Sequence, residues 1–168
     1  YAANAFLAIK ISFINEMAAL CKEMGADIEE VANGMGLDSR IGSKFLQAGP
    51  GWGGSCFPKD TKALAKMALD YGLKMSIVDS AIESNEQTKL SMVDHIKASC
   101  DGDLKGKKIS VLGLAFKANT DDMRDAPALT ILPELVKRGA IVKAYDPQSM
   151  DQAKRALPEG IQFCSSAN

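Results

Sequence analysis

The chain has few of the residues that make metal centres. Among 168 residues there is one histidine, His95, and the four cysteines include no C-x-x-C pair, so we expect no metal site. A formal net charge of −1 gives no electrostatic reason to expect nucleic acid or a membrane surface as a partner. The sequence also has no uninterrupted apolar run of membrane-spanning length and no signal peptide. Cysteines without framework spacing suggest reduced thiols, and together these absences predict a cytoplasmic protein.

What is present is typical of a globular protein, with 46% hydrophobic and 24% charged residues. The length suggests one or two domains. The sequence begins at Tyr1 inside a strongly helical pattern, without a methionine, and ends at Asn168 without a closing element. We therefore expect a piece of a longer protein.

Residues 1–98 are predicted to form an all-helical domain. From Tyr1 to about Met24, apolar residues such as Phe6, Phe13 and Leu20 recur at helical spacing on a wide face. This first helix should be buried along most of its length, against a bundle partner or another subunit. Three further helices are expected at 27–35, with Asp27 as N-cap, at 59–71 and at 76–98.

The second part of the chain has a different pattern. A polar linker at 99–108 is followed over 109–168 by a strand, a helix at about 126–138 and a second strand. The strands are expected at 109–114 and 141–145, with a weak third at 161–163. This order predicts a parallel βαβ unit of Rossmann-like type. The fold class is therefore α plus α/β, and we expect the second domain to be incomplete because so few strands cannot bury both sheet faces.

The most informative stretch is residues 49–60, which read Gly-Pro-Gly-Trp-Gly-Gly-Ser-Cys-Phe-Pro-Lys-Asp. Glycines lead to Cys56 at the expected start of a helix, where Pro58 is tolerated in the first turn. The positive end of that helix would stabilise a thiolate, and Asp60 lies one turn further on. An isolated cysteine is more often a small buried hydrophobe, and that interpretation suits the other three. The surroundings of Cys56 favour a nucleophile.

A second group of candidate residues follows the first strand of the βαβ unit. A dinucleotide fold has its phosphate loop there, but Ala115 and Phe116 replace the later glycines of G-x-G-x-x-G, so a standard dinucleotide grip is not expected. Phe116 and Lys117 instead offer a ring for stacking and a cation for a phosphate, and Arg124 offers a fork-shaped partner for an anion. A solvated charged loop is the alternative at this point.

Several segments together closely resemble the UDP-glucose 6-dehydrogenase family, in family order from Tyr1 to at least Pro147. These segments are Asn4-Ala-Phe-Leu-Ala, Ile11-Ser-Phe-Ile-Asn-Glu16, Gly25-Ala-Asp27, Arg40-Ile-Gly42, Gly53-Gly-Ser-Cys-Phe-Pro-Lys-Asp60 and Gly113-Leu-Ala-Phe-Lys117. The resemblance implies an N-terminal NAD-binding domain, which is absent from this sequence. It also implies a central helical domain that dimerises, and a UDP-binding domain of which this chain holds the first part. We expect a homodimer built on the first long helix.

The chemistry that the resemblance implies is a twofold oxidation of the C6 alcohol of UDP-glucose to UDP-glucuronate with NAD+ as oxidant. Cys56 would form a thiohemiacetal and then a thioester, Asp60 would be the base for hydrolysis, and Asn4 would bind the oxygen at C6 and the water. The family's catalytic lysine falls just before Tyr1, outside the sequence; Lys10 is not its equivalent. The isolated chain is therefore expected to be inactive.

The resemblance also assigns binding residues. UDP-sugar contacts are implied for Arg40 (from the neighbouring subunit), Phe45, Leu46, Gln47, Gly51, Trp52, Gly53, Phe116 and Lys117. Positions near NAD are implied for Lys59 and Arg124.

Three alternatives remain open. The substrate could be GDP-mannose or UDP-N-acetylmannosamine, which relatives of the same plan oxidise. The chain could be a dimerisation and scaffold module without catalysis, which the apolar face of the first helix would suit. A cysteine hydrolase would need a base beside Cys56, and His95, next to Asp94, is the one histidine available.

Overall fold

The computed structural model describes residues 1–167, whose contacts divide into two compact units. The first unit comprises Tyr1–Trp52 and Cys56–Thr88, and the second comprises Gly53–Ser55 together with the chain from Lys89 onward. Helix α4 (Ser76–Ser99) therefore contributes residues to both units.

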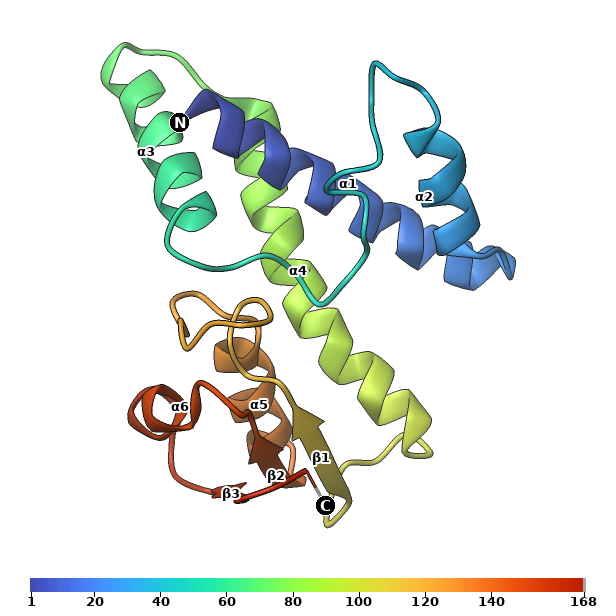
Figure 1. Ribbon diagram of the computed structural model, residues 1–168, viewed down its shortest axis with the longest axis vertical. Helices are drawn as coiled ribbons and strands as arrows, with labels where there is room; N and C mark the ends of the chain where they lie inside the picture. The colour runs from blue at the N-terminus through green and yellow to red at the C-terminus, as the bar shows by residue number, and fades with distance from the viewer. Residues whose placement is uncertain (168) are drawn as a thin grey trace. The chain divides into compact units, whose positions relative to one another are not determined.

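The first unit is all-helical, as predicted. It contains α1 (Ala2–Met24), α2 (Ile28–Gly36), α3 (Phe57–Asp70) and the first part of α4, and both α2 and α3 pack against α1 (Figure 1). Gly25 ends α1 in the left-handed conformation at φ +69°, where a residue without a Cβ is favoured. Asp27 is the N-cap of α2, as expected, and its carboxylate accepts the N–H of Glu29 at 2.7 Å.

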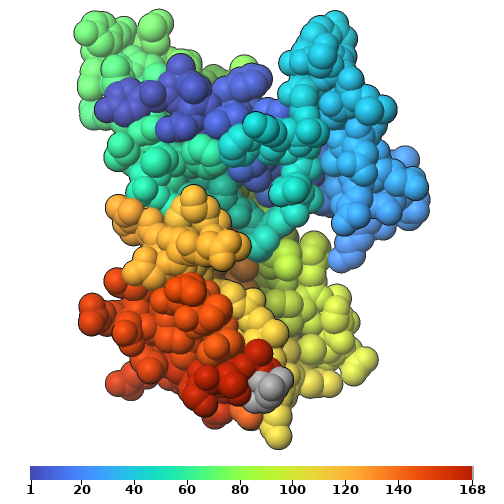
Figure 2. Space-filling view, in the orientation of Figure 1, coloured from blue at the N-terminus to red at the C-terminus, as the bar shows by residue number. Residues whose placement is uncertain are grey.

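Helix α1 buries small and polar residues rather than its large apolar row. Its buried positions are Ala5, Ala8, Ser12, Ile14, Asn15 and Cys21. Phe6, Phe13 and Leu20 are 63%, 47% and 50% exposed, so no bundle partner within the single chain covers this row of α1, and its burial against another subunit stays a prediction. Figure 2 shows the N-terminal part of α1 at the surface of the face drawn. Because these three residues recur every seven positions, they share one face of the helix.

By length and composition, α1 is the one helix within residues 1–167 that could cross a bilayer, although core helices of soluble proteins meet the same criterion. Its sequence is not an uninterrupted apolar run, because Asn4, Lys10 and Glu16 lie within it. The polar side chains of α1 bond to the rest of the first unit: Asn4 to Asp60, Lys10 to backbone carbonyls, and Ser12 to Ala81. These bonds favour a helix that packs on protein.

The second unit contains the predicted parallel βαβ arrangement. Strands β1 (Lys108–Leu112), β2 (Ile141–Tyr145) and β3 (Ile161–Phe163) pair in that order, all parallel, with α5 (Ala128–Lys137) and α6 (Met150–Ala156) between them. Val142 lies in register with Ile109 on one side and Ile161 on the other. β1 ends two residues earlier than predicted, because Gly113 turns the chain at φ +87°.

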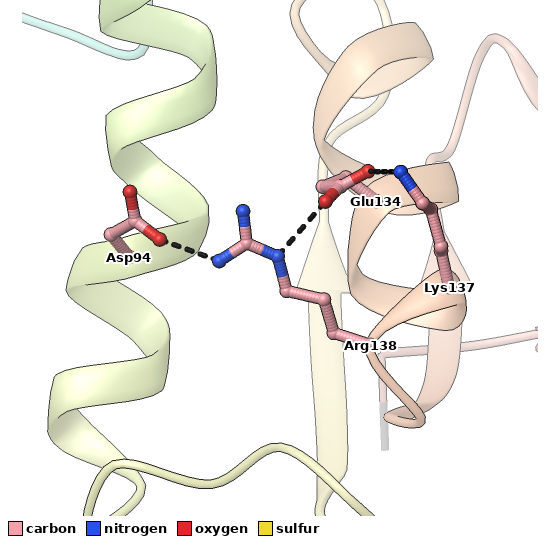
Figure 3. A network of polar contacts seen from close by, with 4 residues as sticks. All are labelled: Asp94, Glu134, Lys137 and Arg138. Atoms are coloured by element: carbon pink, nitrogen blue, oxygen red, sulfur yellow. Dashed lines mark hydrogen bonds and ion pairs between the residues drawn. The ribbon is translucent and has the colours of Figure 1, made fainter.

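The core of the second unit forms around the sheet and takes in the last turns of α4. Val93 of α4, Leu135 of α5 and Val142 of β2 are fully buried in one apolar cluster. At its edge, Arg138 donates to Asp94 of α4 and Glu134 of α5, and Lys137 also bonds Glu134 (Figure 3). These ion pairs are solvated, so burial of the cluster contributes far more to stability than they do.

Candidate active site

Cys56 is the N-cap of α3, which begins at Phe57, two residues earlier than predicted, with Pro58 in its first turn. Its carbonyl accepts the N–H of Asp60 at 2.8 Å, so the carboxylate lies one helical turn beyond the sulfur. Cys56 is exposed, whereas Cys21 is buried and the other two cysteines are partly buried. Of the four thiols, Cys56 is the one most open to a reactant.

Asp60 is a buried carboxylate held by two partners. Asn4 Nδ2 donates to Asp60 Oδ2 at 2.6 Å, and Lys59 Nζ lies 3.2 Å from Oδ1. The hydrogen bond from Asn4 lowers the pKa of Asp60 most; burial opposes it, and Lys59 adds to the lowering. In turn, the hydrogen bond and charge of Asp60 raise the pKa of Lys59. Two of the predicted catalytic residues, Asn4 and Asp60, are therefore in direct contact, and Asp60 is ionised at neutral pH.

The glycine loop ahead of Cys56 is anchored by polar side chains of two helices. Asn85 of α4 makes two bonds to the main chain of Trp52: its Oδ1 accepts the Trp52 N–H at 2.7 Å, and its Nδ2 donates to the Trp52 carbonyl at 3.0 Å. Ser12 of α1 accepts the indole N–H of Trp52 at 3.0 Å. Asn15 accepts the N–H of Gly49 at 2.8 Å. The loop backbone is thus fixed on the helical unit.

Phe57, the residue after Cys56, packs its ring against two other aromatic rings. The centroid of the Phe57 ring lies 6.2 Å from that of Phe45 and 6.3 Å from that of Trp52, and the Phe57 and Trp52 rings meet edge-on. Phe45 holds a positive φ of +64°, which is uncommon for a residue with a side chain and marks a constrained turn. Trp52 and Leu46 are only 6% and 3% exposed, so these two predicted binding residues offer little surface to a ligand in the single chain.

The segment before that turn is held by Lys10. Its ammonium donates to the carbonyls of Ile41 at 2.9 Å, Gly42 at 3.4 Å and Lys44 at 2.7 Å. Arg40, on the same segment, is exposed and paired with the carboxylate of Asp38. A cavity of about 560 Å³ lies beside this segment, lined by Ile11, Ala32, Asn33, Ser43, Lys44, Phe45, Leu46 and Gln47.

The remaining predicted residues lie in the second unit, which includes Gly53–Ser55. The N–H of Gly54 donates to the carbonyl of Arg124 at 2.7 Å. A Cβ on Gly54 would come within 2.7 Å of the Phe116 ring, and one on Gly53 would collide with the carbonyl oxygen of Asp125. Glycine is therefore required at both positions. Gly51, in the first unit, has a φ of +110°.

Lys117 and Arg124 are exposed cations in this unit. Lys117 Nζ lies 5.2 Å from the centre of the Phe116 ring, and Arg124 makes a two-point bond to Asp122. A cavity of about 800 Å³ adjoins Arg124, lined by residues 120–124, Leu129, Gln152, Arg155 and Ala156.

A nicotinamide dinucleotide does not fit the βαβ unit through its usual grip. In a dinucleotide fold, the glycine-rich turn after the first strand approaches the diphosphate. In this chain that turn contains Leu114, which is buried, and Phe116. The predicted cofactor residues Lys59 and Arg124 are exposed cations, and each is paired with a carboxylate of its own unit, Asp60 and Asp122 respectively. Residues 1–167 contain no cluster of three or more histidine, cysteine or acidic side chains that could hold a metal.

Four polar residues that hold these loops were not predicted from the sequence: Lys10, Ser12, Asn15 and Asn85. Lys10, Ser12 and Asn15 interrupt the apolar pattern of the first helix, which is their one signal, whereas Asn85 lies in a polar stretch and has none. Ser12, Asn15 and Asn85 are buried, and buried polar groups need partners.

The fold and the site define a class of protein: a helical domain with a cysteine and a carboxylate one turn apart, followed by a Rossmann-like βαβ domain. Residues 1–87 match the UDP-glucose/GDP-mannose dehydrogenase family, central domain, and residues 110–168 match the UDP binding domain of the same family. The chain belongs to the UDP-glucose/GDP-mannose dehydrogenase family.

Relatives and solved structures agree. The chain is 53% identical over 161 residues to the UDP-glucose 6-dehydrogenase of Rhizobium meliloti, with 96% of this chain and 37% of the relative covered. It is 54% identical over 163 residues to UDP-glucose 6-dehydrogenase TuaD of Bacillus subtilis, with 97% and 35% covered. The structure of a UDP-glucose dehydrogenase from Pyrobaculum islandicum superposes with a TM-score of 0.93 at 41% identity, covering 99% of this chain and 38% of that one. The chain thus spans little more than a third of the length of these relatives.

Proposed function

We propose that the full-length protein is an NAD-dependent UDP-glucose 6-dehydrogenase, with Cys56 as its nucleophile and Asp60 and Asn4 as catalytic partners. The observation that carries the proposal is the arrangement at the start of α3: an exposed cysteine at the N-cap, and one turn on a buried, ionised carboxylate bonded to Asn4. The relatives from Rhizobium meliloti, Bacillus subtilis and Pyrobaculum islandicum are all UDP-glucose dehydrogenases, which favours this sugar nucleotide.

Cys56 and Asp60 carry out the proposed chemistry, with Asn4 bonded to Asp60. The Cys56 thiolate adds to the C6 aldehyde of the half-oxidised sugar, and the carbonyl oxygen takes a proton to give a thiohemiacetal. Loss of a hydride from C6 and a proton from the oxygen leaves a thioester. Water then attacks the thioester carbon while Asp60 takes its proton, and Cys56 departs as the thiolate. NAD+, held elsewhere in the full-length protein, supplies the hydride acceptor for both oxidations.

Substrate contacts are proposed from both units. In the first, the backbone of 46–52, Phe45 and Gln47 would surround the sugar nucleotide. In the second, Phe116, Lys117 and the backbone at Gly53 would meet its sugar and phosphates. Lys117 supports this role because its ammonium is exposed and can approach a phosphate.

A homodimer through α1 is part of the proposal, with Arg40 reaching the neighbouring subunit's substrate. Phe6, Phe13 and Leu20 form one exposed apolar face, and a second copy of α1 would cover it. We expect Phe13→Asp in the full-length protein to lower the mass measured by light scattering at micromolar concentration, and Lys22→Asp, an exposed change in the last turn of α1, to leave it unchanged. A Phe13→Asp protein of unchanged mass would place the interface elsewhere.

Two alternatives of other classes are less well supported. A scaffold without catalysis does not explain an exposed cysteine one turn from a buried carboxylate. A cysteine hydrolase would require His95 to be oriented by an acid, but the neighbouring Asp94 is bonded to Arg138.

The test is NADH formation by the full-length protein with UDP-glucose, GDP-mannose and UDP-N-acetylmannosamine as substrates. We expect activity with UDP-glucose, in a cytoplasmic enzyme, and none from the isolated 168-residue chain. Cys56→Ser should abolish turnover to the acid. Cys164→Ser is the control and should not, because Cys164 is half-buried directly after β3 and has no proposed role. UDP-glucuronate formation by Cys56→Ser at a rate near wild type would show that another group is the nucleophile.

A further inference from the structure

The carboxylate of Asp146, at the end of β2, is buried and accepts four backbone N–H groups. Oδ2 accepts from Leu114 at 2.7 Å and Ala115 at 3.2 Å, and Oδ1 accepts from Gln148 at 2.8 Å and Ser149 at 2.9 Å. Two of these donors belong to the turn after β1 and two to the turn that opens α6. One side chain therefore ties together two loops that follow neighbouring strands.

No cationic side chain pairs with Asp146 among the residues that the structure describes. Burial alone would raise the pKa of Asp146, but the N–H groups of Leu114, Gln148, Ser149 and Ala115 outweigh it and lower the pKa to about 2. The carboxylate is thus charged at neutral pH, and backbone dipoles compensate the charge.

The position of Asp146 is the one that binds ribose in dinucleotide folds. There, an acidic residue after the second strand accepts the hydroxyls of the adenosine ribose. An ionised carboxylate offers about four acceptor sites, and in this chain four N–H groups occupy them. Asp146 is therefore not free to accept a ribose hydroxyl, in keeping with the missing glycine grip.

We propose that Asp146 is a positioning residue, which fixes the turn after β1 so that Phe116 and Lys117 project from a defined backbone toward a nucleoside diphosphate sugar. Apart from Asp146, the hydrogen bonds of this turn are the N–H of Gly113 to the Tyr145 carbonyl and the N–H of Phe116 to the Asp122 carbonyl. Leu114 and Ala115, between these two bonds, are held by Asp146. The identity of the ligand rests on the proposed function; the geometry of the turn does not.

The test compares Asp146→Asn with Asp151→Asn in the full-length protein. Asparagine keeps the shape of Asp146 but turns an N–H₂ toward backbone N–H groups, whereas Asp151 is exposed on α6 and serves as the matched control. We expect Asp146→Asn to raise the KM for UDP-glucose about tenfold, in line with the loss of a charge-assisted hydrogen bond, with kcat within about twofold of wild type. A purely structural role would lower the amount of active enzyme and leave KM unchanged.

A double-mutant cycle locates the effect. UDP affinity is measured by calorimetry for Asp146→Asn, for Lys117→Ala and for the double variant. If Asp146 acts by placing Lys117, the double variant should lose less affinity than the sum of the two single losses. Additive losses would overturn the proposed route.

Amide hydrogen exchange tests the geometry without any activity. In the wild-type protein, the N–H groups of Leu114 and Ala115 should exchange slowly, and in a folded Asp146→Asn protein they should exchange at least about tenfold faster. Fast exchange in the wild type would refute the proposal even if the variant failed to fold. Slow exchange together with no oxidation of UDP-glucose would instead refute the proposed function and keep Asp146 as the anchor of the turn.

Discussion

Replacing Asn85 with alanine should loosen the glycine loop ahead of Cys56 more than any other single change in α4. Asn85 is 1% exposed, and its amide forms both the donor and the acceptor bond to the main chain of Trp52. The change leaves a buried N–H and a buried carbonyl of Trp52 without these partners.

The expected cost follows from those two groups. Each buried polar group left unpaired costs about 1–3 kcal/mol, so Asn85→Ala should lower the free energy of unfolding by about 2–6 kcal/mol. The lower end applies if water enters the space vacated by the amide. Since domains of this kind are stable by about 5–15 kcal/mol, the effect is a large part of the total.

Trp52 is the single tryptophan of the chain, so its fluorescence in the 168-residue protein reports the loop directly. We expect a red-shifted emission in the absence of denaturant, because Trp52 becomes more exposed, and a lower urea midpoint. Gln87→Ala is the matched control, since Gln87 is exposed on the same helix and should shift the unfolding free energy by less than about 0.5 kcal/mol. An Asn85→Ala protein with the wild-type emission maximum and midpoint would refute the idea that the Asn85 amide holds the loop in place.

Further predictions concern the turns and the charges. Gly54→Ala should destabilise the protein by at least about 1–2 kcal/mol in urea unfolding, because φ is +86° and the added methyl group meets an aromatic ring, whereas Gly49→Ala, in open space, should be neutral or slightly stabilising. The pKa of Asp146 is lowered to about 2 in the folded protein, so the ionised carboxylate adds about 2–3 kcal/mol to the free energy of unfolding above pH about 4, and this contribution is lost as the pH falls toward 2. Free energies of unfolding measured against pH should show this loss in the wild type and not in Asp146→Asn. Arg138→Ala, which frees Asp94, should lower the unfolding midpoint slightly at low salt, and the difference should shrink at about 1 M salt.

Most of the secondary structure could be predicted because its signals are local. Apolar periodicity places α1 and α4 within one residue of their ends, and the runs 141–145 and 161–163 are strands at the expected positions. The sequence pattern places the start of α3 two residues too late, because Pro58 occupies the second helical position and Phe57 the first. The exposure of Phe6 and Phe13 could not be predicted, since helical periodicity shows which residues share a face but not what covers it.

The same distinction holds for the site. Cys56 and Asp60 are four residues apart, so their relation follows from the helix itself. The bond from Asn4 to Asp60 and the bonds from Asn85 to Trp52 join residues far apart in the chain, and no local pattern predicts such contacts. Asp146 could be placed at a strand end from the sequence, but its four N–H partners depend on how two turns fold over it.

The contact between Asn4 and Asp60 bears on how hydrolysis would proceed. A carboxylate whose pKa is lowered is a weak base, so at rest Asp60 draws a proton from water less readily than an ordinary aspartate would. An amide N–H₂ has two donors, and the contact with Asp60 uses one of them. In the proposed reaction the other would meet the oxygen at C6, where charge would develop as water attacks the thioester. If Asn4 then shifts toward that oxygen, its bond to Asp60 weakens and the pKa of the carboxylate rises at the step that needs a base. Asn4 would thus connect the stabilisation of the oxyanion with the strength of the base.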